Sequence, residues 1–348
     1  MSTGDFIRTV PLFSGIDSKD LDTFLGIFRP VTFAAGECLV RQGHAADSAY
    51  ILESGSAEVV AALPGGGEHP VTSLGPGSVL GEMALIESAT RSATVTARSA
   101  VTGYSVERDN FRMLLAQRNH AAFQIQSRIA RTLCARLREL NTRVMASDAL
   151  GQVAPPMARR EGGAAHRGAV SFDWRAFLAA LPLFRRFAPL EIDEFARLAA
   201  VVEPRRGELV FEQGAPSTAW YVVVRGAVEI ANAHGGRHRR VGILGPGRLC
   251  GLLALIESQP HSMGAVAREN STLLEFDRAA FDRLYAGDDR LSSRFRDAVN
   301  QELLQALART NNHLVRLISQ ARIRDARAKS AEVEELQRAL GAQDCRAA

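Results

Sequence analysis

The sequence predicts a mainly β protein with α-helices: two similar antiparallel β-barrels, each with flanking helices, and one long C-terminal helix. The chain repeats itself, because residues 74–96 and 244–266 share Leu-Gly-Pro-Gly and Ala-Leu-Ile-Glu-Ser, residue 244 matching residue 74 at a shift of 170. Short β-rich runs alternate with turn residues about every 8–12 positions, which is typical of antiparallel barrels and sandwiches. Each copy then changes to a helical period, and 348 residues are enough for two domains.

The repeat extends beyond this stretch. At a shift of 171, Gly36-Glu37 matches Gly207-Glu208, and Gln42-Gly43 matches Gln213-Gly214. The first copy therefore carries one extra residue, which we place near the glycine-rich turn 64–67. Two copies are too few for a solenoid, so we expect two similar domains.

Composition favours a soluble globular protein. Hydrophobic residues make up 46% and charged residues 23% of the chain, and the net charge is a mild +4. No apolar run is long enough for a membrane span or a signal peptide, so we expect a cytoplasmic protein. The four cysteines show no spacing typical of a metal site or a disulfide framework.

The first copy begins with a helix and continues in strands. Asp17 and Ser18 can cap a helix whose apolar stripe comprises Leu21, Phe24, Leu25 and Phe28. Strands are predicted at residues 32–33, 37–41, 48–52, 57–62, 69–74, 92–97 and 101–107.

The second copy repeats this order. Pro189 opens a helix that carries Ile192, Phe195 and Leu198 on one face. Strands are predicted at residues 209–212, 220–224, 227–231, 239–244, 264–267 and 272–276.

A helical tail follows each barrel. The first, about residues 109–147, has an apolar seam of Ile125, Ile129, Leu133, Leu137, Leu140 and Val144. This seam can pair with another helix or pack on its own barrel, and the pattern leaves both open. The second tail has no Gly or Pro between Gly287 and Gly341, which permits about fifty residues of helix and a possible coiled coil. We expect a homodimer through one of the seams 129–140 and 303–317.

These patterns divide the chain into four parts. Residues 1–148 form the first barrel with its helix, and the Gly-, Pro- and Ala-rich stretch 149–172 is a linker. Residues 173–288 form the second barrel, and residues 289–348 form the long C-terminal helix.

One segment of the first copy has the residues of an anion site. Gly81 and Glu82 precede a short helical turn whose free N–H groups can face a ligand, and Arg91 can supply a fork of donors to a phosphate. Glu82 would repel an anion unless it accepts a hydroxyl proton, so a phosphate beside a sugar hydroxyl suits both side chains. Under the 170-residue shift, Leu252 replaces Glu82 and His261 replaces Arg91. A surface salt bridge is the alternative for this acid and base.

This segment resembles the cyclic nucleotide-binding domains of the catabolite activator protein and of the regulatory subunits of cyclic-nucleotide-dependent protein kinases. Their phosphate-binding cassette is Gly-Glu-x-Ala-Leu followed by Arg-x-Ala, and here residues 81–85 and 91–93 match it. The resemblance covers about residues 11–147 and, more loosely, 182–285. It implies jelly-roll-like barrels of the cyclic-nucleotide-binding type.

The resemblance also implies roles for individual residues. Arg91 would hold the cyclic phosphate and Glu82 the ribose 2′-hydroxyl, while Gly81 and the N–H groups of Met83 and Ala84 complete the cradle. Ser92 would lie near the phosphate or base, and Asn141 near the purine. A solvated strand residue at Ser92 and a polar notch in a helical seam at Asn141 are the alternatives.

The second copy is predicted to be a structural pseudo-site. Leu252 cannot accept a hydrogen bond from a ribose hydroxyl, and His261 is only partly charged near neutral pH. The ligand is therefore expected once per chain.

The function predicted from these observations is a non-enzymatic sensor. The first domain binds cyclic AMP or cyclic GMP, with cyclic AMP favoured and no metal required, and the helices relay occupancy to an unidentified protein partner. The alternative is an assembly protein that uses the tandem domains and long helices as interaction surfaces. A DNA-binding regulator is less favoured because we find no helix-turn-helix pattern. We expect neither a nucleic acid partner nor a membrane span.

Overall fold

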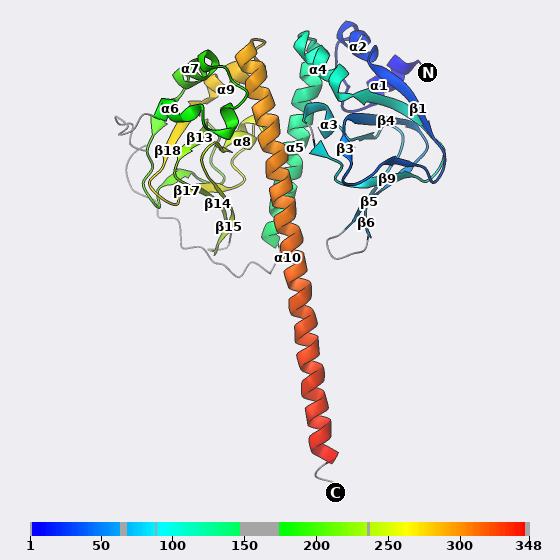
Figure 1. The fold of residues 1–348 in the computed structure, drawn as a ribbon, viewed down its shortest axis with the longest axis vertical. Helices are drawn as coiled ribbons and strands as arrows, with labels where there is room; N and C mark the ends of the chain where they lie inside the picture. Colours follow the sequence, from blue (N-terminus) through cyan, green and yellow to red (C-terminus); the bar gives the residue numbers. More distant parts are fainter. Residues whose placement is uncertain (1, 63–67, 88, 147–173, 235–236, 345–348) are drawn as a thin grey trace. The chain divides into compact units, whose positions relative to one another are not determined.

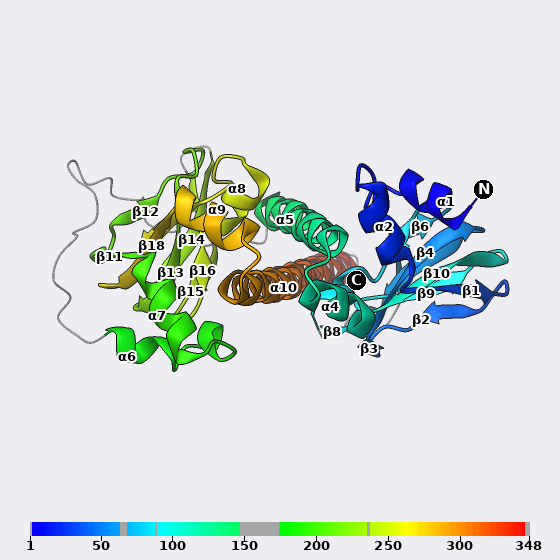
Figure 2. The same cartoon turned by 90° about the horizontal axis from the view of Figure 1, so that it is seen from above.

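The computed structural model describes residues 2–62, 68–87, 89–146, 174–234 and 237–344. Two compact units form: the first comprises the chain up to Leu133 together with Asp288–Leu304, and the second comprises Cys134–Gly287 with the chain from Gln305 onward. Each unit contains one antiparallel barrel with flanking helices (Figures 1 and 2). The predicted linker 149–172, the glycine turns at 64–67 and 235–236, and Cys345 lie outside the described residues.

The first barrel consists of two four-stranded antiparallel sheets with strand orders β1-β10-β4-β7 and β2-β9-β5-β6, plus the short pair β3-β8. Its elements are α1 (Thr3–Thr9), α2 (Ser18–Leu25), β1 (Phe28–Phe33), β2 (Cys38–Val40), β3 (Ala45–Ala46), β4 (Ser48–Ser54), β5 (Ala57–Ala62), β6 (Glu68–Leu74), β7 (Val79–Leu80), α3 (Met83–Ile86), β8 (Ala89–Thr90), β9 (Thr94–Ala97), β10 (Val101–Glu107), α4 (Arg108–Ala116) and α5 (His120–Ala146). Small and branched side chains fill the space between the sheets, among them Leu39, Leu52, Ala57, Val95 and Val101.

The second barrel repeats this topology with strand orders β11-β18-β13-β16 and β12-β17-β14-β15. Its elements are α6 (Trp174–Leu178), a 3-10 turn (Pro182–Phe184), α7 (Pro189–Arg197), β11 (Ala200–Val202), β12 (Leu209–Phe211), β13 (Ala219–Arg225), β14 (Val228–His234), β15 (Arg237–Leu244), β16 (Leu249–Cys250), α8 (Leu252–Glu257), β17 (Gly264–Ala267), β18 (Thr272–Asp277) and α9 (Arg278–Ala286). The long helix α10 (Arg290–Asp344) follows; its residues up to Leu304 belong to the first unit and those from Gln305 onward to the second. The predicted fold class, including the long C-terminal helix, is confirmed.

Aromatic side chains pack the flanking helices onto each barrel. In the first unit the ring of Phe24 on α2 lies 5.5 Å from that of Phe28 and 5.9 Å from that of Phe111 on α4. In the second unit Phe276 stacks on Trp220 at 4.3 Å and lies 4.6 Å from Phe195 on α7. These buried rings pack α2 and α4 onto the first barrel and α7 onto the second.

The end of the first predicted helix differs from the sequence pattern. Phe28, assigned to the helical stripe, is the first residue of β1, because α2 ends at Leu25 with Gly26 as its C-cap. Phe28 still faces the core, since a strand can bury its first side chain as a helix can.

The helical tail after the first barrel is two helices rather than one. Arg118 between α4 and α5 has a positive φ of 59°, and the Asn119 side chain accepts a hydrogen bond from the Ala122 N–H at 2.9 Å. The break therefore depends on one left-handed residue and one asparagine cap, in a segment without Gly or Pro.

The burial of the apolar seams on α5 and α10 differs from residue to residue. Ile125, Ile129, Leu133, Leu137 and Val144 of α5 are all buried within the single chain, and Leu140 is half-buried. On α10, Leu303 and Leu317 are buried, whereas Leu307 and Leu314 are half-buried. None of the helices in the described ranges is both long enough and apolar enough to cross a membrane.

Candidate functional site

The turn between β7 and α3 depends on Gly81. Its φ is +72°, which favours glycine. A Cβ at this position would lie 2.3 Å from Nη1 of Arg91 and 3.0 Å from the Ser48 carbonyl oxygen. Only a residue without a side chain fits here, and the absence of a Cβ lets the Arg91 guanidinium lie directly against the turn.

Arg91 is held from its backbone to its guanidinium. Its N–H donates to the His44 carbonyl at 2.8 Å, and its carbonyl accepts from the Gly43 N–H at 2.9 Å. Nη1 donates to the Ser48 carbonyl at 2.7 Å, and Nη2 donates to the Ser48 hydroxyl at 3.1 Å. These contacts fix the direction of the guanidinium before any ligand arrives, which lowers the entropy cost of binding.

The Arg91 side chain is only 7% exposed, whereas that of its ion-pair partner Asp47, at 3.5 Å, is 75% exposed. Burial lowers the pKa of Arg91, and the neighbouring Tyr50 and Asp47 act in the opposite direction. An arginine keeps its charge under such a shift. A buried cation whose carboxylate partner is largely solvated is well suited to hold an anion.

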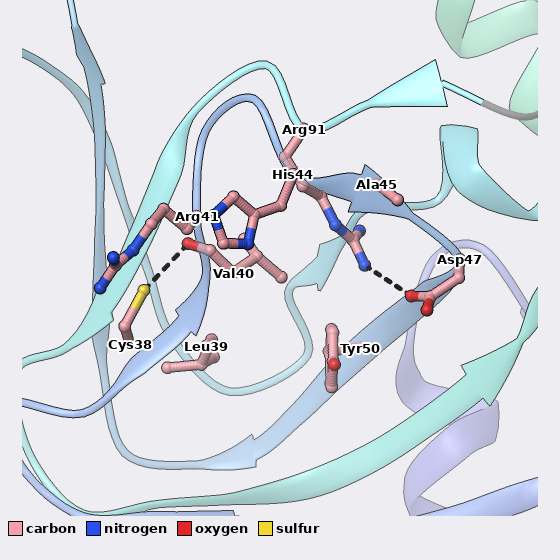
Figure 3. A pocket seen from close by; sticks show the side chains of 9 residues that line it. All are labelled: Cys38, Leu39, Val40, Arg41, His44, Ala45, Asp47, Tyr50 and Arg91. Carbon is pink, nitrogen blue, oxygen red and sulfur yellow. Dashed lines mark hydrogen bonds and ion pairs between the residues drawn. The ribbon is translucent and has the colours of Figure 1, made fainter.

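A cavity of about 350 Å³ opens beside Arg91 (Figure 3). This volume falls in the range of small-molecule pockets. The cavity is lined by Cys38, Leu39, Val40, Arg41, His44, Ala45, Asp47, Tyr50 and Arg91. Three basic side chains, one carboxylate, one phenol and an apolar wall thus surround it, which suits an anionic ligand with a flat apolar part.

The other cassette residues form the turn itself. Glu82 is the buried N-cap residue of α3, and its carbonyl accepts from the Leu85 N–H at 3.2 Å. The Ala84 N–H donates to the Gly81 carbonyl at 2.9 Å, so this predicted ligand donor is engaged within the turn. The cavity lining includes Arg91 but neither Glu82 nor Met83.

No described contact joins Ser92 or Asn141 to this turn. Ser92 is exposed, in the short segment between β8 and β9 rather than in a strand. Asn141 is buried on the part of α5 that belongs to the second unit. The structure therefore brings Gly81 and Arg91 together, while a ligand role for Ser92 and Asn141 remains a prediction.

A family model described as the cyclic nucleotide-binding domain matches residues 30–118 and 201–288, which together make up half of the chain. The chain belongs to the cyclic nucleotide-binding domain family. Both matched segments coincide with the barrels, so the chain contains two domains of this family.

Sequence relatives include two cAMP-dependent protein kinase regulatory subunits. That of Blastocladiella emersonii is 24% identical over 274 residues, covering 78% of this chain and 56% of the relative. That of Emericella nidulans is 36% identical over 110 residues, covering 32% of this chain and 26% of the relative. The chain thus spans about half the length of the first relative and about a quarter of the second.

Among solved structures, the regulatory domain of Toxoplasma gondii PKA, crystallised with cAMP, is 23% identical to this chain. The match covers 82% of this chain and 91% of that one, with a TM-score of 0.31.

The second cyclic nucleotide-binding domain has different side chains at the matching place. The ring of Phe211, which stands where Val40 stands in the first domain, stacks on His261 with ring centroids 4.1 Å apart. The ring of Tyr221 is also stacked on that of Phe211, with ring centroids 6.0 Å apart. Burial, with a further contribution from Arg138, lowers the pKa of His261, which favours the neutral form of its imidazole. Leu252 is also buried. Packed aromatic rings and a histidine therefore occupy the place that Arg91 occupies in the first domain.

The sequence does not predict that Asp47, Ser48 and Tyr50 surround the Arg91 guanidinium. A comparison of the two copies gives a partial indication: Asp47 and Ser48 are replaced by Thr218 and Ala219 in the copy that lacks the arginine, while Tyr50 is kept as Tyr221. Within the part of the chain that the structure describes, no group of three or more His, Cys, Asp or Glu side chains is placed to hold a metal ion.

Proposed function

We propose that this protein is a non-enzymatic cyclic nucleotide sensor. The first domain binds one cyclic nucleotide, cyclic AMP in preference to cyclic GMP, and helices relay its occupancy to a protein partner. The observation that carries the proposal is the buried, pre-positioned Arg91 guanidinium beside a cavity of about 350 Å³, in a turn that only glycine at position 81 permits.

The proposed binding chemistry assigns a separate role to each cassette residue. The Arg91 guanidinium supplies paired N–H donors to the cyclic phosphate, and its burial strengthens this charge-assisted contact. The Glu82 carboxylate accepts the ribose 2′-hydroxyl proton, and the N–H groups of Met83 and Ala84 turn to the phosphate. The Ala84 N–H must first release the Gly81 carbonyl. Cyclic AMP is favoured because the curated relatives carry cAMP dependence in their names.

The proposed relay runs along α5. Its residues up to Leu133 belong to the first unit, and from Cys134 onward they belong to the second. In the first unit, the guanidinium of Arg296 on α10 lies 4.5 Å from the ring centre of Phe123 on α5. In the second unit, Arg138 Nε donates to the Glu257 carboxylate on α8 at 3.0 Å, and Nη2 donates to the same oxygen. A continuous helix anchored in both units can carry a displacement from one to the other.

The proposed partner is a protein. The curated relatives are named regulatory subunits of a cAMP-dependent protein kinase, so a kinase catalytic subunit is the partner class to test first. A ligand produces a signal only if it has different affinities for two conformations of the protein. The relay therefore requires that the conformation of α5 differs between free and bound protein.

Isothermal titration calorimetry of the purified chain with cyclic AMP and with cyclic GMP tests the proposal. We expect one site per chain and tighter binding of cyclic AMP. Two equivalent sites per chain would show that the second domain also binds, and the absence of binding to either nucleotide would refute the sensor function.

A further inference from the structure

Two basic side chains besides Arg91 face the cavity of the first domain: Arg41 and His44 (Figure 3). The backbone places His44 next to Arg91, because its carbonyl accepts the Arg91 N–H at 2.8 Å and the preceding Gly43 N–H donates to the Arg91 carbonyl at 2.9 Å. Strand pairing continues this contact through Ala45 and Thr90. The imidazole and the guanidinium are therefore neighbours at one rim of the cavity.

The second domain keeps this backbone arrangement and changes the side chains. There the His261 N–H donates to the Ala215 carbonyl at 3.0 Å, and the Gly214 N–H donates to the His261 carbonyl at 2.8 Å. Ala215 stands at the place of His44, and Glu212 at that of Arg41. The loop thus folds without a histidine. The second domain therefore lacks counterparts of both Arg41 and His44, as it lacks counterparts of Arg91 and Glu82.

We propose that His44 is a ligand-contacting residue of the first domain, whose imidazolium donates a hydrogen bond to a cyclic phosphate oxygen on the solvent side of the one held by Arg91. This inference rests on the proposed function, because it deepens the description of the same site. Arg41 adds to the positive field of the cavity, so that the anion meets three cations rather than one.

The contact makes nucleotide binding dependent on pH. The charged and titratable groups that line the cavity together with His44 are Arg41, Arg91, Asp47, Tyr50 and Cys38. A phosphate anion in the cavity favours a positive charge on a neighbouring imidazole. Binding therefore takes up a proton, and affinity rises as the pH falls through the range in which an imidazole titrates.

Calorimetric titration with cyclic AMP at about pH 6 and about pH 8, on either side of the ordinary imidazole pKa of about 6.5, tests this inference. We expect the wild type to bind roughly three- to tenfold more tightly at the lower pH, the range expected for one ordinary hydrogen bond, because His44 is exposed and water weakens the contact. His44→Ala and His44→Gln should bind with the same affinity at both values. His120→Ala, which removes an exposed imidazole at the start of α5 in the same unit, should behave as the wild type.

The outcomes separate this inference from the function on which it rests. If the wild type binds cyclic AMP and His44→Ala keeps the full pH dependence, the His44 contact is wrong and the sensor function stands. If the wild type binds no cyclic nucleotide, both fail. Because Ala215 occupies the same backbone position in the second domain, His44→Ala should fold, and an unchanged melting temperature checks this.

Discussion

Arg91 shows how much of this site is decided by single residues. Its guanidinium lies against the bare Cα of Gly81 and donates to both the carbonyl and the hydroxyl of Ser48. An arginine that is 7% exposed has lost most of its hydration, so a phosphate contact regains what burial has removed. In the matching place of the second domain, a buried histidine, whose lowered pKa favours the neutral form, stacks on a phenylalanine.

Arg91→Ala should therefore weaken cyclic nucleotide binding by at least about tenfold, since a hydrogen bond to a charged group contributes about 1.5–3 kcal/mol. Calorimetry measures the change. His261→Ala is the matched control, because it alters the corresponding residue of the degenerate domain and should leave the affinity unchanged. If Arg91→Ala binds cyclic nucleotide with wild-type affinity, the assignment of the binding site to Arg91 is wrong.

The sequence predicts the Gly81–Arg91 contact well, because the second copy keeps the glycine and the spacing at Gly251 and His261 but has lost the arginine. It does not predict the partners of the guanidinium. Ser48 acts mainly through its backbone carbonyl, which any residue supplies, and Asp47 lies more than forty positions from Arg91 in the chain. Contacts of this kind become visible only when the strands are paired.

At the scale of elements, the pair Arg138–Glu257 fixes α5 to α8 within the second unit. The Glu257 side chain is 9% exposed and that of Arg138 is 26% exposed. Burial raises the pKa of the nearby Cys134 thiol to about 12, and the Glu257 carboxylate adds to the effect. The surroundings of the pair are therefore poorly hydrated, which makes an uncompensated charge there costly.

Arg138→Gln should destabilise the second unit by about 1–3 kcal/mol, because it leaves the more deeply buried Glu257 without this partner, and Glu257→Gln should cost less. The double variant should cost less than the sum of the two single variants. Denaturant unfolding followed by the fluorescence of Trp220, which is fully buried in the second barrel, measures these differences.

Arg143→Gln is the control for this series. It removes an exposed pair with Glu139 on the same helix, and such a pair contributes about 0.2–1 kcal/mol. Equal losses for Arg138→Gln and Arg143→Gln would show that the α5–α8 contact adds nothing specific.

The break between α4 and α5 marks the limit of sequence reasoning at this scale. The approximate positions of the strands follow from the spacing of turn residues, and the length of α10 follows from the long interval without Gly or Pro. Arg118, which lies between α4 and α5, has a left-handed φ, and an arginine in the sequence does not predict this backbone conformation. The seam on α5 illustrates the same limit, because an apolar spacing of three and four fits an exposed coiled coil and a buried helix equally well.

At the scale of the whole molecule, the predicted homodimer now rests on α10. Every residue of the α5 seam except Leu140 is buried within the single chain, whereas two leucines of the α10 seam, Leu307 and Leu314, are half-buried. Pairing these leucines with those of a second chain would stabilise a dimer by about 25 cal/mol per Å² of apolar surface removed from water.

Leu307→Glu should therefore shift the protein from dimer to monomer at micromolar concentration, because it places a charge in the paired seam. Light scattering coupled to size-exclusion chromatography measures the mass. Gln305→Glu, which adds the same charge at an exposed position of the same helix, should leave the dimer intact. A monomeric wild type would refute the dimer itself.

Hydrogen exchange with and without cyclic AMP tests the central claim most directly, because it reports both the site and the path of the signal. Bound ligand should protect amides in the cassette, residues 77–95, and in α5 at about residues 125–144. The corresponding segment of the second domain, residues 244–266, should change little. Protection confined to residues 77–95 would contradict the relay and favour an assembly protein that binds a nucleotide. Protection centred on residues 244–266 would contradict the assignment of the site to Arg91.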